Sequence, residues 1–242
     1  MYKRVVLMLL SCFPVVSLAS EPAVKETNYS LSASYTTMSS SDPITVNGYG
    51  VMGMSRFALG DHTGMQLSGS VYRGYTEWDS LQFESTSSLV GASFFARDYD
   101  LGSVNMDFSY GGGQGYSSGN GYTDTSYQLV SLSGTYYLGQ FDLGAGLYQV
   151  SYSNSWTDLD NSSNIGASYY ATDNLSLGAT VSGRDSSGDR TLHVIFQPSV
   201  FNNQWSITGL VSKGDTSDTS YLFLVGYYFD TKVSLIDRNR KY

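Results

Sequence analysis

Catalytic side chains are scarce in this chain, which has two histidines, His62 and His193, and one cysteine. His193 lies near Asp185, Asp189 and several serines in the sequence, and Ser, His and Asp are the residues of a hydrolytic triad. Serine is common along the whole chain, however, and closeness in sequence does not establish triad geometry. We therefore assign no catalytic residue, and a hydrolase is the least favoured of the functions considered.

The acidic residues do not form a convincing metal site. Asp158 and Asp160 form one close pair in a polar stretch, and Asp215 and Asp218 form another. Such pairs bind a cation weakly and are better interpreted as solvated loop charges. The chain has 21 acidic and 13 basic residues, which argues against nucleic acid as a partner. We expect no metal, no cofactor and no nucleic acid.

A different chemistry, selection of solutes by a charged channel wall, requires charges on one face of extended strands. The segments concerned carry mainly Ser, Gly, Thr and Tyr on that face, which suits a water-filled interior. Because the candidate arginines on this face are roughly offset by two aspartates and the acidic outer loops, the sequence predicts only a weak charge preference. The candidate lumen-lining or rim residues are Arg56, Arg73, Arg97, Asp107, Asp142 and Arg184.

The segments that must position these residues alternate between apolar and small polar side chains. In the stretch 103–110, SVNMDFSY, the apolar residues Val104, Met106 and Phe108 oppose Ser and Asp residues. In the stretch 221–229, YLFLVGYYF, one face is wholly apolar or aromatic. This period of two predicts β-strands, and an apolar face on every strand is typical of strands that cross a membrane. A buried strand of a soluble sandwich shows the same alternation in isolation.

The lengths of the connections favour the membrane barrel over the sandwich. Polar connections alternate between longer ones, such as 112–124, and short turns, such as 139–140, as in outer-membrane barrels with periplasmic short turns. The predicted fold is all-β, a transmembrane antiparallel up-and-down β-barrel of about twelve strands, with ten to fourteen compatible. The predicted strands are 28–37, 45–59, 65–75, 86–97, 103–111, 125–138, 141–152, 164–171, 175–184, 190–199, 204–213 and 219–229.

The first residues read as an export signal. Lys3 and Arg4 precede an apolar stretch, and Ser17-Leu18-Ala19 has small residues where a signal peptidase cleaves. Cys12 follows a lipoprotein-like sequence, but apolar residues continue after it, so cleavage after Ala19 is preferred. The predicted parts are a signal peptide (1–19), a barrel (20–229) and a C-terminal tail (230–242). Cleavage removes the lone cysteine and changes the formal net charge from −8 to −10.

The stretch 221–229 resembles the closing strand of Gram-negative outer-membrane β-barrels, which typically ends in an aromatic residue, usually Phe. In those proteins the strand is the recognition signal for barrel assembly. Here residues 230–242 follow Phe229, which departs from that pattern. The architecture resembles small monomeric porin-like barrels of the outer membrane, including the twelve-stranded oligosaccharide channels of enterobacteria. The resemblance implies outer-membrane lipid and the barrel-assembly machinery as partners.

Aromatic residues gather near both ends of the predicted strands, as they do at the two interfaces of a membrane barrel. Tyr faces can also stack on sugars, but the few lumen arginines make acidic sugars an unfavourable substrate. The girdle candidates are Tyr35, Tyr110 and Tyr152 beside the long loops, and Phe141, Trp205 and Phe229 beside the short turns.

The favoured function is therefore a porin-like channel for passive diffusion of small hydrophilic solutes in the outer membrane. Twelve strands enclose a lumen wider than Ser and Gly side chains can fill. The alternatives are a non-conducting structural or surface-interaction barrel and, less favoured, an outer-membrane hydrolase. The glycine-rich stretch 111–125 is expected to be a surface loop or a loop folded into the lumen. The tail 230–242 has no assigned role.

Overall fold

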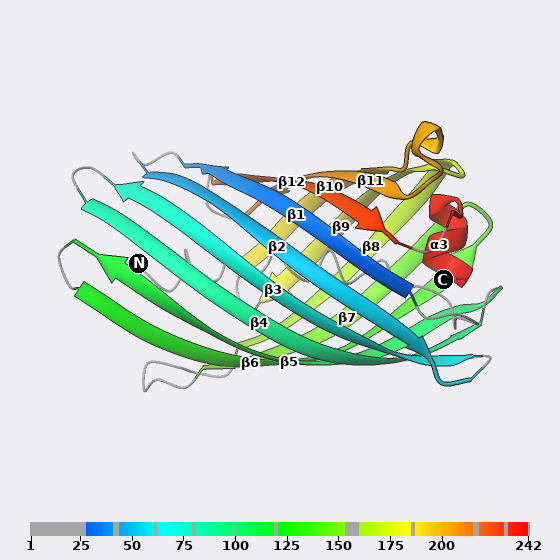
Figure 1. Ribbon diagram of the computed structural model, residues 1–242, viewed down its shortest axis with the longest axis horizontal. Helices are drawn as coiled ribbons and strands as arrows, with labels where there is room; N and C mark the ends of the chain where they lie inside the picture. Colours follow the sequence, from blue (N-terminus) through cyan, green and yellow to red (C-terminus); the bar gives the residue numbers. More distant parts are fainter. Residues whose placement is uncertain are drawn as a thin grey trace.

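A closed barrel of twelve antiparallel strands forms the body of the computed structural model, which confirms the predicted fold (Figure 1). The structure describes residues 28–40, 44–60, 62–78, 81–98, 100–118, 121–152, 160–184, 187–214, 218–229 and 232–241. The predicted signal peptide lies outside these residues. Among them, no helix is both long enough and apolar enough to cross a membrane.

Each strand pairs with its neighbours in the sequence, and the barrel closes where the first strand meets the last. Ser30 pairs with Tyr228 and Ser39 with Thr219 across this seam. The strands are β1 (Asn28–Ser39), β2 (Ile44–Ala58), β3 (Thr63–Trp78), β4 (Leu81–Asp98), β5 (Gly102–Ser117), β6 (Gly121–Leu138), β7 (Phe141–Tyr152), β8 (Asp160–Thr172), β9 (Leu175–Arg184), β10 (Ser187–Phe196), β11 (Trp205–Lys213) and β12 (Thr219–Tyr228).

Alternation along the strands separates an apolar outside from a mostly polar inside. Val104, Met106 and Phe108 of β5 are exposed on the outside, whereas Ser103 is buried within the barrel. On β12, Tyr221 and Phe223 likewise face outward. Closure gives every strand a partner on both sides, so the backbone hydrogen-bonding groups along the paired stretches are satisfied within the sheet, as a lipid environment requires.

The strands differ greatly in length around the barrel. Strands β4 and β6 have 18 residues and β3 and β5 have 16, whereas β9 to β12 have 9 or 10. About 9–11 residues suffice to cross the hydrocarbon core. Strands β3 to β6 therefore extend past it at the long-loop end, on the left of Figure 1.

The glycine-rich stretch 111–125 is neither a surface loop nor an infolded one, and that prediction was wrong. It continues the ladder of β5 and β6 from the pair Gly111–Tyr127 to the pair Ser117–Gly121. Gly111 makes room for the inward Tyr127 ring, because a Cβ at Gly111 would lie 2.5 Å from Tyr127 Cζ. The tip, residues 119–120, lies outside the described residues.

Short connections join the strands at the other end, on the right of Figure 1. Gly139, with a φ of 59°, makes the tight β6–β7 turn, and a 3₁₀ turn, η1 (Ser199–Phe201), joins β10 to β11. The chain then ends in a helix, α3 (Leu235–Lys241), which lies at this end beside the turns. The sequence did not predict this helix.

Candidate functional site

Most of the predicted lumen charges lie on the inward face of the barrel. Arg56 and Arg97 are buried near the short-turn end, and Arg56 Nε donates to Gln66 Oε1 at 2.7 Å. Asp107 lies farther along β5 and accepts hydrogen bonds from the hydroxyls of Ser93 and Ser131. Asp142 faces inward on β7. The side chain of Arg184, at the end of β9, lies outside the described residues.

Arg73 is an exception, because it lies on the outside of the barrel rather than in the lumen. It shares a face of β3 with the exposed Leu67 and Val71. Its Nη2 pairs with Glu84 Oε2 of β4 at 3.1 Å, and both side chains are about half exposed. The guanidinium also lies 5.2 Å from the centre of the Tyr75 ring. Its charge therefore lies on the outer face of the barrel and does not line the lumen.

The predicted girdle residues face outward, with one exception. Tyr35 and Tyr110 are exposed towards the long-loop end, and Phe141, Trp205 and Phe229 are exposed at the short-turn end. The rings of Trp205 and Tyr227 lie 5.0 Å apart there. Tyr152 instead faces inward, because it has the parity of Asp142 on β7, and its ring lies 6.3 Å from that of Tyr127. Its assignment to the girdle was wrong.

Helix α3 is attached to the short-turn end by its first residues. Ser234 accepts a hydrogen bond from the Asp237 backbone N–H at 3.2 Å and donates to the Asp237 carboxylate at 3.0 Å, which caps the helix. The Ile236 N–H donates to Asp173 O at 3.0 Å, and the Leu235 N–H donates to Asn174 Oδ1 at 3.2 Å. These bonds fix the helix to the β8–β9 turn.

The last part of α3 reaches across to β7 and β8 through charge and aromatic contacts. Arg240 Nη2 lies 2.6 Å from Asp142 Oδ1, and both side chains are largely buried. The hydroxyl of Tyr170 donates to Asp142 Oδ2 at 2.8 Å, and Asn239 Nδ2 donates to that hydroxyl at 2.7 Å. The Arg240 guanidinium also lies 4.9 Å from the centre of the Tyr137 ring. Asp142 is therefore neutralised by the tail.

Arg238 holds the opposite side of the helix. It is fully buried, and its guanidinium lies 3.6 Å from the centre of the Tyr228 ring on β12. Its Nη2 donates to Asn203 O in the β10–β11 connection at 2.8 Å. Gln197, also fully buried, donates to Val233 O at 2.9 Å. The tail thus contacts the short-turn end from β7 to β12, and its Leu235 and Asn239 face into the barrel there.

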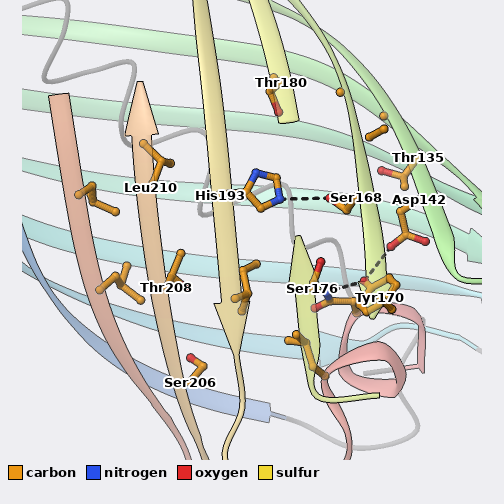
Figure 2. Close-up of a pocket in the computed structure, with 18 of the residues that line it drawn as sticks. Thr135, Asp142, Ser168, Tyr170, Ser176, Thr180, His193, Ser206, Thr208 and Leu210 are labelled. Atoms are coloured by element: carbon orange, nitrogen blue, oxygen red, sulfur yellow. Dashed lines mark hydrogen bonds between the residues drawn. The ribbon is translucent and has the colours of Figure 1, made fainter. Parts of the chain in front are cut away.

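A cavity of about 130 Å³ lies directly inside the barrel next to α3. Figure 2 shows side chains of β8, β10 and β11 pointing into it, among them Ser168, His193 and Leu210. One wall is apolar, with Leu210, Leu222 and Leu224 forming a buried cluster. The sequence does not reveal this wall, because both faces of the stretch 221–229 are apolar and alternation alone shows no contrast there.

The cavity holds the only Ser–His contact in the part of the chain that the structure describes. Ser168 Oγ and His193 Nε2 are 3.1 Å apart. Among the described residues His193 Nδ1 has no hydrogen-bond partner, whereas a triad needs an acid there to orient the base. The carboxylate of Asp142 is engaged by Tyr170 and Arg240 instead. No group of three or more potential metal ligands occurs among the described residues.

Comparison with known proteins identifies the fold. The chain is similar to the translocator domain of the autotransporter NalP from Neisseria meningitidis, with a TM-score of 0.66, 15% identity, and coverage of 93% of this chain and 96% of that one. The β domain of the Bordetella autotransporter BrkA has a TM-score of 0.59 and 13% identity, with coverage of 85% of this chain and 99% of that one. The KdgM porin has a TM-score of 0.54 and 14% identity, with coverage of 82% of this chain and 99% of that one. The sequence matches no protein-family model and no curated protein.

These similarities establish the fold of Gram-negative outer-membrane β-barrels. Their identities are too low to transfer an activity, and they include both autotransporter domains and a porin. The functional conclusion therefore depends on the lumen of this chain.

Proposed function

We propose that the protein is a porin-like channel of the Gram-negative outer membrane for passive diffusion of small hydrophilic solutes. The mature chain begins after Ala19 in this proposal, and its partners are outer-membrane lipid and the barrel-assembly machinery. Its substrates are small solutes. The observation that carries the proposal is the polar inward face of a closed twelve-strand barrel, lined largely by Ser, Thr and Gly.

Physical considerations support a water-filled lumen. An eight-strand barrel has an interior that side chains just fill, and the diameter grows roughly in proportion to strand number. Small inward residues such as Ser34, Gly50 and Ser68 cannot fill the larger interior of twelve strands. Asp107, hydrogen-bonded to two serines, adds a polar group that water stabilises.

The tail restricts this channel at one end. Short turns are periplasmic in outer-membrane barrels, so α3 occupies the periplasmic mouth in this proposal. Four inward arginines, Arg56, Arg97, Arg238 and Arg240, lie near that mouth, together with Asp142. They offset part of the acidic excess of the chain, so we expect a weak charge preference rather than strong selection for cations.

A non-conducting barrel is the second candidate, and the docked tail favours it. With Arg238 fully buried and Arg240 largely buried, α3 is packed as a structural element rather than loosely attached. The Ser168–His193 contact without an orienting acid gives little support to a hydrolase.

Planar-bilayer recordings of the refolded protein test the channel. We expect discrete current steps from the full chain and larger steps from a variant lacking residues 230–242. As a matched control, deletion of residues 114–121 removes the hairpin tip at the opposite end, where β5 and β6 continue beyond the membrane, and should leave the step size unchanged. No steps from any of the three proteins, with folding and insertion verified, would reject the channel and favour the structural barrel.

A further inference from the structure

We propose that the cavity between α3 and strands β7 to β12 is a binding site for an uncharged, ring-sized amphipathic molecule, such as a phenol or a cyclic alcohol. This inference rests on the proposed function, because solutes reach the lumen through the proposed channel. It adds one class of solute that binds inside the barrel. The cavity has about 130 Å³ of space and lies next to the helix (Figure 2).

The apolar wall defines one half of the ligand. Leu210 of β11 pairs with Leu222 of β12, and Leu224 follows on the same face of β12, so the three form one continuous patch. Leu235 of α3 also lines the cavity and is almost fully buried. Bare leucine surface facing water is unfavourable, so an apolar edge of a ligand placed against this patch is stabilised by displacing that water.

Polar side chains next to this patch define the other half of the ligand. Ser168 and His193 face the cavity from β8 and β10, and His193 pairs with Leu210 of β11, so these polar groups lie directly beside the leucine patch. Among the described residues His193 Nδ1 has no hydrogen-bond partner. A buried imidazole nitrogen without a hydrogen bond is costly, and a ligand hydroxyl can satisfy it as donor or acceptor. This arrangement calls for a molecule with a hydroxyl group on one side only.

The charges around the cavity exclude an ionic ligand. Asp142 is the acidic residue of the lining, and its carboxylate is engaged by Arg240 and Tyr170. The remaining polar groups of the lining, including Thr135, Thr180 and Asn164, are neutral. A charged ligand would lose its hydration without gaining an opposite charge, which is strongly unfavourable.

Gly144 of β7 leaves space on the cavity wall. A Cβ placed on Gly144 would meet nothing closer than 3.8 Å, so the strand itself is not crowded at that point. An apolar protein cavity of about 150 Å³ is known to hold benzene, which sets the size of the ligand at a single ring.

The test uses ¹⁹F NMR of 4-fluorophenol with the full-length protein in detergent. We expect saturable binding at one site, much weaker binding of 4-fluorobenzoate because it is charged, and weaker binding of fluorobenzene because it lacks the hydroxyl. Gly144→Leu fills the cavity and should weaken 4-fluorophenol binding at least about tenfold. Gly209→Leu is the matched control, since Gly209 lies on the outward face of β11 with nothing within 4 Å of its added Cβ. It should bind as the unmodified protein does.

Two further variants identify the groups responsible. Removal of residues 230–242 takes away the part of the lining supplied by Leu235 and Asn239 and should abolish saturable binding. His193→Leu should reduce binding of 4-fluorophenol to the level of fluorobenzene. Equal binding by the Gly144→Leu and Gly209→Leu variants, or non-saturable uptake that follows detergent concentration, would overturn the inference. Binding without conductance would reject the channel and keep this site, and conductance without binding would do the reverse.

Discussion

The ion pair between Arg240 and Asp142 should decide whether the tail stays docked. Their side chains are only 9% and 13% exposed, and the two atoms lie 2.6 Å apart. Removing one partner of a buried pair costs about 3–5 kcal/mol, because the other charge is left buried and uncompensated. Since about 1.4 kcal/mol is a factor of ten, Arg240→Gln should raise the undocked fraction at least about 150-fold, up to complete undocking.

Trypsin provides the assay, because the tail contains a tryptic cleavage site after Arg238. The bond after Arg238 is protected while that residue is fully buried. A helix of seven residues is not stable alone in water, so an undocked tail is unfolded and cleavable. A Lys232→Gln background removes the exposed cleavage site at the start of the tail. Cleavage at Arg238, followed by mass spectrometry, then reports the undocked population when docking is fast relative to proteolysis.

Two comparisons make the outcome specific. Arg190→Gln changes an exposed arginine on the outside of β10 and should leave the cleavage rate unchanged. Combining Arg240→Gln with Asp142→Asn leaves two neutral amides instead of one buried charge, so the double variant should be cleaved more slowly than Arg240→Gln alone. Unchanged protection in Arg240→Gln, with a normally folded barrel, would refute the assigned role of the pair.

Three other outcomes follow from the barrel itself. Phe108→Arg should lower the yield of folded, heat-modifiable barrel far more than Ser109→Arg, because an arginine facing lipid at the bilayer midplane costs about 2–4 kcal/mol and Ser109 faces inward. Gly48→Ala should lower stability to urea unfolding by about 1–3 kcal/mol, since its Cβ would lie 1.6 Å from Tyr72 Oη, whereas Gly53→Ala, with open space, should change little. The variant without the tail should show a reversal potential shifted towards cations in a salt gradient, because the arginines of α3 are lost.

The period of two in the sequence was enough to predict the barrel, but not where its strands end. Membrane strands are recognised by an apolar outward face, and on β5 that face becomes polar after Tyr110, at Gln114. The ladder nevertheless continues to Ser117, because backbone hydrogen bonding does not depend on lipid contact. Strands that extend into water therefore appear in the sequence as polar, glycine-rich loops.

Side-chain direction could have been predicted more accurately by parity than by residue type. Arg73 has the parity of Leu67 and Val71, and Tyr152 that of Asp142, so counting by twos places the first outside and the second inside. A charge in a predicted strand was assigned to the lumen because lumens are polar. Beyond the hydrocarbon core, however, the outer face is polar as well, which allows the exposed Arg73–Glu84 pair.

The tail could not be placed from the sequence because its partners are distant and its helix is short. Ser234 and Asp237 have the spacing of a helix cap, but seven helical residues give no clear periodicity. The pairing of Arg240 with a residue 98 positions earlier exists only once the barrel has brought β7 to the same end as the tail. The sequence therefore predicts Asp142 as a lumen charge, whereas in the structure its carboxylate binds Arg240 and holds the tail in place.

Asp142 connects the cavity to the docked helix α3. Asp142 is engaged by Arg240 and Tyr170, and all three groups lie where α3 meets the cavity lining. A ligand that binds only when Leu235 and Asn239 are in place stabilises the docked tail by mass action, and by the same linkage a docked tail strengthens binding. In the proposed channel, a bound ligand then holds α3 in the docked position, and the docked helix restricts the passage of other solutes. Raising the concentration of 4-fluorophenol should slow tryptic cleavage after Arg238, and it should not do so in the Gly144→Leu variant.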